Sequence, residues 1–509
     1  MPKRTLAKIL AMALTAGVLT SCGSSNSVTP NPAKGSLITI VEDAPICNVI
    51  SATLTLTGLS FTPVGGGANA SYLTTTASFA PSIRLNLQQL RDFNTILYVF
   101  NVNAGNYNQA NLLVELAQVA TYEPTLTPPV KLLTTTLTQP KPTIALSSPL
   151  VITPGQANVL LLDFDVLHML QANAAGQLTG VVKPVISVTP LTAANGNGFA
   201  EFDDLSGFVR SVTLSNTTSN PLYTGSFLMQ LLSPSVSGAP AMAVNLTANT
   251  NLVGFPDLAH LVPDSYMEVD ATLDSQGNLA GNTVEFQALE HPYASSSTKP
   301  ASTALIGPIV SISTDQVGNP TQFNLWVRDA EPMDPSNITL DSIFQVNLSS
   351  GTVFQVSALG PNFANLGFGP LNLAVGQEVV VHGVYTRPPA STGTKSNLPV
   401  TVNPSAIFLK LQSLQGSLGS IVQIGSDNLT GAFVLNPCCT LLQGAPIYVL
   451  TNNQTTFVNT NGLGGLTSQE GLLVKGMPFF EPQAGTINGV PIPAGTLVVE
   501  AKQVRRLQM

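Results

Sequence analysis

The chain has 509 residues, of which 44% are hydrophobic and only 9% charged, and its net charge is −8. A hydrophobic share this high excludes an intrinsically disordered chain, and the length is enough for roughly three to five domains. Acidic residues outnumber basic ones by 27 to 19, so the chain lacks the basic footprint of a nucleic-acid-binding protein. Abundant Thr and Val, without long amphipathic stretches, favour strands over helices.

Residues 1–22 have the layout of an export signal. A basic start precedes an apolar run at residues 9–19, and two small residues then precede Cys22. The run is too short for a transmembrane helix, which needs about 20 apolar residues. The segment Leu19-Thr20-Ser21-Cys22 resembles the lipobox of bacterial lipoproteins. The resemblance implies a signal peptide at residues 1–21, lipid on the Cys22 sulfur, and export of the rest of the chain.

The residues after Cys22 predict how the exported part is held. Gly23 stands where retention at the inner membrane would favour Asp, so we expect the outer membrane, on its periplasmic or surface face. Residues 22–35 are polar and punctuated by proline, which is typical of a flexible tether. We therefore expect contact with the membrane through the lipid anchor at Cys22.

From residue 36 the pattern is one of consecutive strands. Ala52, Leu54 and Leu56 alternate with threonines, as in a strand with one buried face. Gly105 and Tyr107 stand at a corner where the tyrosine hydroxyl can bond back to the backbone, as in Greek-key sandwiches. Strands without long helices between them predict a β-sandwich. The other expected strands are residues 37–41, 72–79, 83–87, 96–102, 111–119, 143–146 and 159–164.

Residues 36–200 form the first expected domain. Five short motifs carry its resemblance to a family, and they lie at residues 43–45, 83–87, 104–107, 162–165 and 182–186. On these motifs the domain resembles an uncharacterised family of bacterial lipoproteins, related to transthyretin-like and carboxypeptidase-regulatory-like sandwiches. The resemblance implies a fold but no activity, because the family has none established.

The remaining sequence repeats three times. A Gly-x-x-x-Ser-Val/Ile motif begins at Gly207, Gly307 and Gly416, at intervals of 100 and 109 residues. Each copy is large enough for a small domain and shows about five strands, and a glycine in the first strand suits the tight coiling of a small barrel. We predict three OB-like five-stranded barrels at residues 201–292, 304–411 and 412–509. The expected fold is therefore all-β, an N-terminal Greek-key β-sandwich followed by three tandem OB-like β-barrels.

A second repeated motif supports the same division. An apolar strand ends at Asp270, His382 and Lys475, and a glycine follows the last two, whereas the first copy has Ala271. The copies resemble another uncharacterised family of bacterial exported proteins with tandem β-barrel repeats. Residues 292–302 are rich in Ser and Pro and are expected to be a linker, and residues 387–397 a long loop inside the second barrel.

Three cysteines remain besides Cys22. Adjacent Cys438 and Cys439 can close a vicinal disulfide, whose small ring makes it more reducible than an ordinary bridge. A bridge from Cys47 to either would join the first domain to the last and needs Cα atoms within about 7 Å, which tandem domains seldom provide. We therefore expect Cys47 to be a buried free thiol. The alternative is that all three cysteines stay reduced.

The histidines and nucleophile motifs give no catalytic site. The four histidines are scattered without metal-binding spacing, and no nucleophile elbow occurs. Asp163 and Asp165 follow a strand, where Asp165 is expected to cap a short helix rather than to act as an acid. We predict no cofactor and no catalytic residue.

The densest acidic stretch is a weak candidate for a calcium loop. It contains Asp329, Glu331 and Asp334, with Asp341 nearby, and hard cations prefer clustered oxygen ligands. The stretch lacks the residue order of a calcium-binding loop, so a solvated loop is the competing interpretation.

Composition favours binding over catalysis. Carbohydrate or protein ligands in the cell envelope remain open, and Tyr448, Phe457, Phe479 and Phe480 are candidate contact residues, although such aromatics are more often part of a core. The expected function is that of a lipid-anchored cell-envelope protein with a non-catalytic binding or structural display role. The alternative is an exported hydrolase whose site is assembled between β domains.

Overall fold

The computed structural model describes residues 33–507, with gaps at 44–48, 67–68, 75–82, 91–93, 194–197, 215–223, 232–234, 237–240, 264, 288–301, 332–339, 358–366, 387–399, 438–440 and 443–445. Within these residues the fold is all-β, with one four-residue helix, α1 (Val166–Met169), and four short 3₁₀ turns. In this part of the chain no helix is both long and apolar enough to cross a membrane.

The first domain is a sandwich of two sheets. A four-stranded sheet runs in the order β13-β10-β1-β5, and it packs on a seven-stranded sheet that contains the long pair β2 and β6. A smaller sheet of β11, β12 and β8 lies at one end. The strands are β1 (Lys34–Asp43), β2 (Val49–Pro63), β3 (Ala70–Thr74), β4 (Ile83–Asn86), β5 (Thr95–Asn103), β6 (Gly105–Tyr122), β7 (Val130–Leu133), β8 (Thr136–Leu137), β9 (Thr143–Ile152), β10 (Ala157–Phe164), β11 (Leu170–Ala172), β12 (Leu178–Val182) and β13 (Ile186–Leu191).

The expected corner hydrogen bond is present in the sandwich. The Tyr107 hydroxyl donates to the Asn103 carbonyl at 2.8 Å, and Gly105 precedes it with φ +154°, a conformation that favours glycine. At the other end of the sandwich, Asp165 caps α1 by accepting from the His168 amide at 3.1 Å. Both expectations from local sequence are confirmed.

The second domain is a closed five-stranded barrel. Its strands pair in the order β14-β15-β17-β20-β19, and β19 returns to β14. With the strands numbered along the chain this is the order 1-2-3-5-4-1, in which the third and fifth pair in parallel, as in an OB fold. The strands are β14 (Ala200–Leu214), β15 (Gly225–Leu231), β17 (Ala241–Leu246), β19 (Tyr266–Leu273) and β20 (Leu279–Gln287), with short additions β18 (Asn251–Val253) and η2 (Leu258–His260). The short strand β16 (Ser235–Val236) pairs instead with β4 and is the seventh strand of the larger sandwich sheet.

The third and fourth domains repeat this topology. The second barrel closes through β22 and β21, and the third through β30 and β35. The second barrel contains β21 (Ser302–Thr314), β22 (Pro320–Val327), β23 (Asp329–Glu331), β24 (Ser342–Asn347), β25 (Val353–Val356), η3 (Pro370–Asn372), β26 (Glu378–Thr386) and β27 (Val400–Leu409). The third contains β28 (Gln412–Ile424), β29 (Gly431–Pro437), β30 (Ile447–Thr451), β31 (Thr456–Val458), η4 (Leu463–Gly465), β32 (Gly471–Glu481), β33 (Gly485–Ile487), β34 (Val490–Ile492) and β35 (Thr496–Arg506).

The repeated glycine of each first strand has a steric cause. A Cβ on Gly207 would lie 2.4 Å from the Gln230 carbonyl oxygen of the second strand, and one on Gly416 would lie 2.4 Å from the Asn436 carbonyl. At Gly307 the corresponding oxygen belongs to Trp326. The first strand of each barrel therefore crosses the second so closely that only glycine leaves room.

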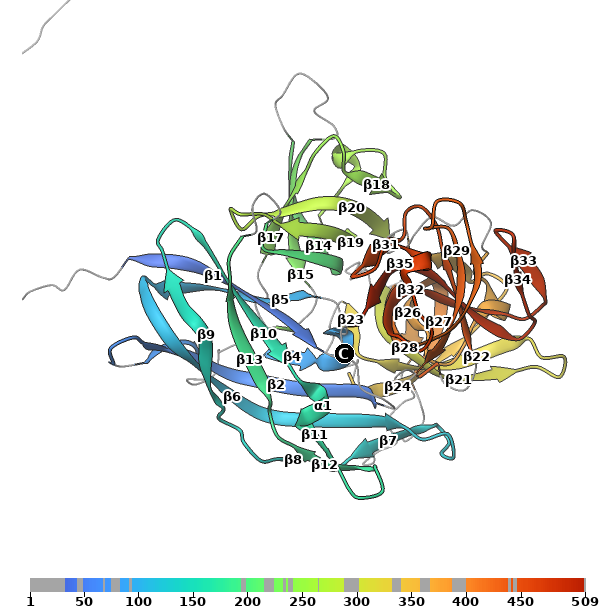
Figure 1. Ribbon diagram of the computed structural model, residues 1–509, viewed down its shortest axis with the longest axis horizontal. Coiled ribbons are helices and arrows are strands. Elements are labelled where there is room, and N and C mark those ends of the chain that lie inside the picture. Colours follow the sequence, from blue (N-terminus) through green and yellow to red (C-terminus); the bar gives the residue numbers. More distant parts are fainter. Residues whose placement is uncertain are drawn as a thin grey trace, which may run out of the picture.

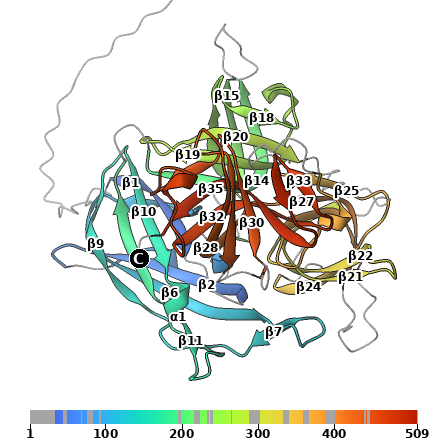
Figure 2. The same cartoon turned by 45° about the vertical axis from the view of Figure 1, so that its right-hand side comes forward.

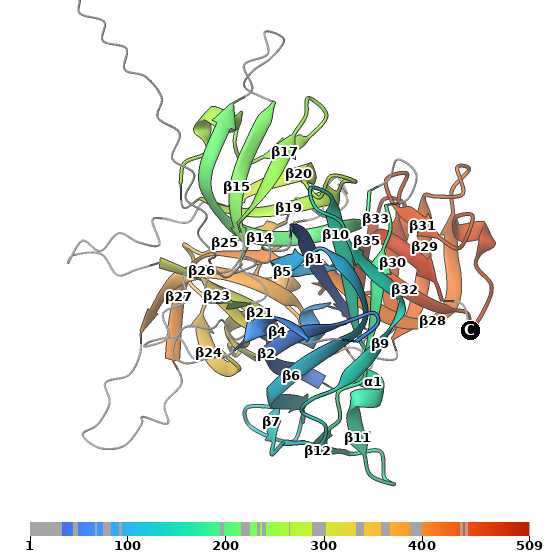
Figure 3. The same cartoon turned by 90° about the vertical axis from the view of Figure 1, so that its left-hand side faces the viewer.

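The four domains do not form an extended array. Figure 1 shows the first barrel (green) above the sandwich (blue to teal) and the third barrel (red) beside it, and Figures 2 and 3 show the second barrel (yellow to orange) packed into the same assembly. Apolar cores cross the boundaries. Ile38 and Ile40 of the sandwich pack with the first barrel, and Met477 and Phe479 of the third barrel pack with the second. The expectation that tandem domains keep the first domain apart from the last is wrong, because each barrel buries an outer face against a neighbour.

The same packing corrects the expectation for the alternating strand. Ala52, Leu54 and Leu56 face the sandwich core, as predicted. The opposite face is also buried, since Thr53 is only 4% exposed and its hydroxyl donates to Asp341 of the second barrel at 3.2 Å. Thr53 is therefore a polar residue that meets the carboxylate of another domain.

Candidate functional site

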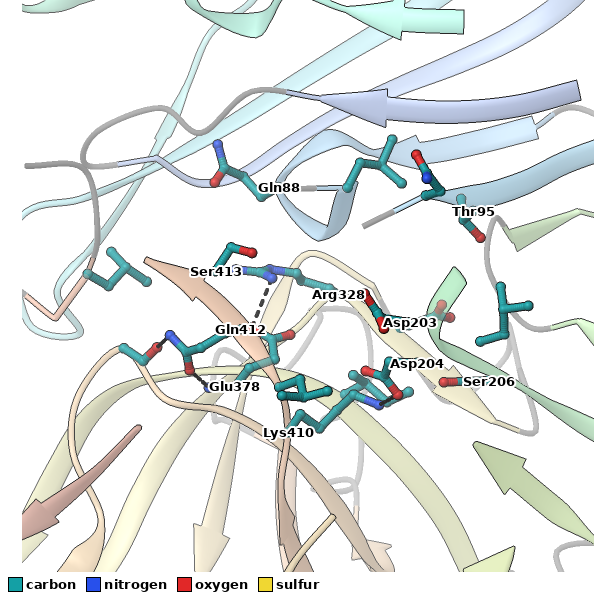
Figure 4. Close-up of a pocket in the computed structure, with 18 of the residues that line it drawn as sticks. Gln88, Thr95, Asp203, Asp204, Ser206, Arg328, Glu378, Lys410, Gln412 and Ser413 are labelled. Atoms are coloured by element: carbon teal, nitrogen blue, oxygen red, sulfur yellow. Dashed lines mark hydrogen bonds and ion pairs between the residues drawn. The ribbon is translucent and has the colours of Figure 1, made fainter. Parts of the chain in front are cut away.

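A cavity lies where the four domains meet. Its volume is about 120 Å³, and its wall is built by Gln88 of the sandwich, Asp204 of the first barrel, Arg328 of the second barrel and Ser413 of the third, among others. Figure 4 shows Gln88 on the sandwich side of this cavity and Ser413 and Arg328 on the side of the second and third barrels. We call this space the junction cavity.

A bulge in β14 turns two carboxylates of the first barrel toward the junction. The pairing of β14 with β19 shifts between Phe202 and Leu205, so Asp203 and Asp204 leave the regular ladder. Asp204 has φ +63°, which is uncommon for a residue with a side chain, and its amide donates to the Asp270 carboxylate at 3.1 Å. The strand thereby presents two consecutive acidic side chains to the cavity.

Each of these carboxylates is paired with lysines of another barrel. Asp203 lies 2.8 Å from the Lys475 ammonium and 2.9 Å from that of Lys502, both in the third barrel. Lys502 also contacts Asp270 at 2.5 Å. These ion pairs join the first barrel to the third, and their partners are largely buried.

Lys410 joins the first barrel to the second. It follows β27 and lies 2.9 Å from Asp204 and 2.5 Å from Glu268. Burial alone would lower the pKa of Lys410, but Asp204 and Glu268 outweigh it and raise this pKa well above its usual value. Lys410 is therefore charged at every physiological pH.

The pKa values of the two adjacent aspartates are shifted in opposite directions. Burial would raise the pKa of Asp203, but Lys502 and Lys475 outweigh it and lower the pKa to about 2. Burial raises the pKa of Asp204 well above its usual value, even though Lys410 opposes the shift. Asp203 is thus the fixed anion of the pair.

The second barrel contributes one paired and one unpaired charge. Arg328 donates from Nη1 to Glu378 at 2.9 Å and from Nε to the Ile50 carbonyl of the sandwich at 3.1 Å. Asp329 is 5% exposed and accepts from the Ala330 amide at 2.9 Å, but it forms no ion pair with a described residue. Burial raises the pKa of Asp329 to about 6.

Two neutral side chains of the wall have unused hydrogen-bonding groups. Gln88 and Ser413 are each 3% exposed. Neither the amide of Gln88 nor the hydroxyl of Ser413 has a hydrogen-bond partner among the described residues. Buried polar groups are nearly always paired, so these groups make the cavity a candidate site for a polar ligand.

The same position in the fourth strand of all three barrels is occupied by a titratable residue. Asp270, His382 and Lys475 each precede a register shift in the fourth strand, and all three are buried. Asp270 and Lys475 enter the ion pairs described above. His382 instead packs against the rings of Tyr266 and Phe408, and burial lowers its pKa to about 3, so it is neutral.

Sequence reasoning missed most residues of the junction. A sequence signal for some of them was present. Apolar strands are interrupted or ended by Lys410, Lys475 and Lys502, and a lysine at such a position is rarely buried without a charged partner. The partners could not be found from one sequence, since each lies in a different domain.

The weak calcium candidate lies only partly within the described residues and stays a prediction. Asp329 lines the junction cavity, and Asp341 pairs with Arg84 and accepts from Ser51 at 2.9 Å. The side chain of Glu331 and all of Asp334 lie outside the described part. No group of three or more acidic, histidine or cysteine residues suited to a metal occurs among the residues that the structure describes. Asp329 and Asp341 are buried, so the solvated-loop interpretation is wrong for these two positions.

The cysteine predictions stay predictions. Cys22, Cys47, Cys438 and Cys439 all lie outside the described residues. The first and last domains nevertheless lie close together near two of these cysteines in the sequence. Ile50 and Leu441, which follow Cys47 and Cys439 closely in sequence, pack in one apolar cluster. The expected separation of the first domain from the last, on which the prediction of a free Cys47 depends, is therefore wrong.

The aromatic candidates for ligand binding belong to cores. Phe479 is 5% exposed and packs between the second and third barrels, and Tyr448 packs against the same cluster. Phe457 and Phe480 pack against the core of the third barrel. We find no aromatic platform in these four positions.

Comparison with known families identifies the first domain. Residues 34–184 match the model of a domain of unknown function, DUF4382. The chain therefore carries a DUF4382 domain, which spans the sandwich up to β12. None of the curated proteins matches the chain.

Two solved structures are among those similar to this chain, and one of them is of a single-stranded DNA binding protein. The wild-type single-stranded DNA binding protein from Thermus aquaticus is 15% identical over 41% of this chain and 93% of its own, with a TM-score of 0.15. The drosophila Unr CSD456 structure is 9% identical over 60% of this chain and 98% of its own, with a TM-score of 0.13. Likenesses this low carry no argument about function, and the OB-like assignment above rests on the strand order of the barrels.

Proposed function

We propose that this protein is a lipid-anchored, exported cell-envelope protein that binds a small polar ligand in the junction cavity, without catalysis. The observation that carries the binding role is the pair Gln88 and Ser413, whose buried polar groups lack partners among the described residues and line one cavity. Four domains contribute to the wall, so a ligand there would also hold them together.

Anchoring is supported by the segment Leu19-Thr20-Ser21-Cys22 after its apolar run. The test is to express the full chain and its Cys22→Ala variant in a bacterium and to compare membrane fractions. We expect the natural chain in the membrane fraction with acyl groups detected by mass spectrometry, and the variant unprocessed and without acyl groups. A natural chain that is soluble and without acyl groups would exclude the anchor.

The binding role is tested by filling the cavity. A library of small polar compounds is screened by thermal unfolding against the detergent-solubilised full chain, against Ser413→Leu and against Ser420→Leu. Ser420 lies in the same strand but is exposed, so it is the matched control. We expect compounds that raise the unfolding temperature of the natural chain and of Ser420→Leu, but not of Ser413→Leu.

The opposite result has a clear meaning. If no compound stabilises the natural chain, and Ser413→Leu is itself more stable, the cavity is a hydrated void without a ligand. A filled void would gain apolar contacts and lose a buried unpaired hydroxyl, which explains why stability would rise.

The hydrolase alternative rests on one observation. Asp329 and Asp203 line the same cavity with pKa values of about 6 and about 2, and such separation is typical of an acid and a nucleophile. Burial raises the pKa of Asp329, whereas Lys502 and Lys475 overcome burial at Asp203. Both carboxylate oxygens of Asp203 contact those lysines, which leaves a poor nucleophile and favours binding. Hydrolysis of chromogenic glycosides by the natural chain, lost in Asp329→Asn, would favour the alternative instead.

A further inference from the structure

The charges of the junction do not balance. Cations at the junction are Arg328, Lys410, Lys475 and Lys502. Carboxylates that line the cavity or pair with these cations are Asp203, Asp204, Glu268, Asp270, Asp329 and Glu378. Among the described residues the carboxylates are in excess by two.

Excess buried negative charge must be neutralised. The pKa of Asp204 and that of Asp270 are raised chiefly by burial, so protons on these two carboxylates can supply this neutralisation. A bound ammonium group would supply it as well, and would offer three N–H donors where a protonated carboxyl offers one O–H donor.

The cations of the wall are not free to hold an anion. Arg328 contacts Glu378 at 2.9 Å and Lys410 contacts Glu268 at 2.5 Å. An anionic ligand would have to break one of these buried pairs, which is costly. Asp329, by contrast, is a buried carboxyl of the wall without an ion pair to a described residue.

The neutral groups of the wall favour an organic ligand over a metal ion. Gln88 offers both an amide N–H and a carbonyl, and Ser413 offers a hydroxyl, and none of these is used by a described residue. Metal sites need several acidic, histidine or cysteine ligands together, and no such group occurs among the described residues. The volume of about 120 Å³ is enough for roughly ten water-sized sites, and so for a molecule of several heavy atoms.

We infer that the ligand of the junction cavity is a small organic cation, an ammonium group placed against Asp329 with polar groups that bond Gln88 and Ser413. The inference rests on the proposed binding function and specifies its ligand class. Asp329 is the recognition residue for charge, and Gln88 and Ser413 recognise the neutral end.

Three probes of one shape test the inference. They are 4-aminobutan-1-ol, butane-1,4-diol and 4-hydroxybutyrate, which share a hydroxyl on a four-carbon chain and differ in the charge of the other end. Binding to the detergent-solubilised full chain is measured by titration calorimetry at pH 7.5. We expect the ammonium probe to bind at least tenfold more tightly than the diol, because charge-assisted hydrogen bonds are stronger than neutral ones, and the carboxylate probe to bind least.

Variants assign the preference to residues. Asp329→Asn is expected to remove the preference for the ammonium probe while leaving the diol affinity within about twofold. Ser413→Ala is expected to lower the affinity for the ammonium probe and for the diol alike, by several-fold. Glu201→Gln, an exposed carboxylate of β14, is the charge control and should change nothing. Circular dichroism of each variant confirms that the β fold is kept.

The outcomes separate this inference from the proposed function. Equal or tighter binding of the diol or the carboxylate probe, unaffected by Asp329→Asn, would overturn the cationic ligand and leave the binding function standing. If none of the three probes binds but the wider screen finds stabilising compounds, the cationic ligand is again overturned and the binding function stands. Absence of any stabilising compound would overturn both.

Discussion

Glu500 is a buried acid without a counter-charge in the described part of the chain. It lies in β35, is 4% exposed, and its Oε1 has no hydrogen-bond partner there. Burial raises its pKa to about 8, from an ordinary 4.5. The folded protein therefore holds a protonated acid at neutral pH.

This carboxyl makes stability depend on pH. A raised folded pKa favours the fold fully below pH 4.5, and that contribution is lost as the pH rises toward 8. We expect Glu500→Gln to be more stable than the natural chain at pH 7 by about 2–3 kcal/mol, and equally stable at pH 4. Thermal unfolding at both pH values measures this. A variant that is less stable at pH 7 would show that Glu500 has a charged partner.

Asp203 has the opposite dependence. Its pKa of about 2 is below the ordinary 3.8 because Lys502 and Lys475 outweigh burial, so its stabilising contribution is present above pH 3.8 and lost as the pH falls to 2. We expect Asp203→Asn to lose about 2–4 kcal/mol at pH 7, because it leaves the buried Lys475 and the partly buried Lys502 with one partner fewer.

The control for Asp203 is Glu201→Gln in the same strand, which is exposed and should change stability by less than about 0.5 kcal/mol. The loss in Asp203→Asn should shrink between pH 7 and pH 3 in thermal unfolding. A loss that is constant over this range would mean that packing, and not charge, is responsible.

At the scale of the elements, one constraint recurs in every barrel. The first strand crosses the second at a glycine, and the fourth strand shifts register next to Gly383 and Gly476. In the first barrel Ala271 takes that place, and the residue opposite is Gly281, which has no side chain. The glycine thus lies on the fifth strand instead of the fourth, and the two strands can still approach as closely as in the other barrels.

The tightest of these crossings gives a test. A Cβ at Gly307 would lie 1.8 Å from the Trp326 carbonyl oxygen, so Gly307→Ala must push the two strands apart. We expect a loss of at least about 2–3 kcal/mol in stability, read as a lower unfolding temperature. Gly485→Ala is the control, because nothing lies within 4 Å of its Cβ. Equal effects of the two substitutions would contradict the crossing.

At the scale of the whole molecule, the domains are held by shared cores and buried ion pairs. The core of the second barrel continues into Met477 and Val498 of the third, and the first barrel packs on Ile38 and Ile40 of the sandwich. Lys410 and Lys475 then connect the first barrel to the other two. Such interfaces resist separation even when the chain between domains is cut.

Limited proteolysis tests this assembly. Residues 292–302 contain Tyr293, which is followed by Ala294, in a Ser- and Pro-rich stretch, and we expect chymotrypsin to cut there first. The two fragments should remain together on gel filtration at pH 7 and separate only in denaturant. Fragments that elute separately under native conditions would show that the interfaces are weak.

The sequence by itself determined the local devices of the fold. The alternation in β2, the corner at Tyr107, the cap at Asp165 and the glycine at Gly307 each depend on residues near in sequence or on one neighbouring strand. Repetition of the glycine motif then predicted three like barrels. These signals are readable because strand period, turn chemistry and steric room are local properties.

Tertiary structure alone decided the candidate site. Asp203 was an ordinary acid in the sequence, and only the bulge in β14 and the approach of Lys475 and Lys502 made it a buried anion. Gln88 and Ser413 had no signal at all, since they become notable only as buried groups of one cavity. Burial and charge pairing depend on which surfaces meet, and residues hundreds of positions apart meet here through packing that no local pattern encodes.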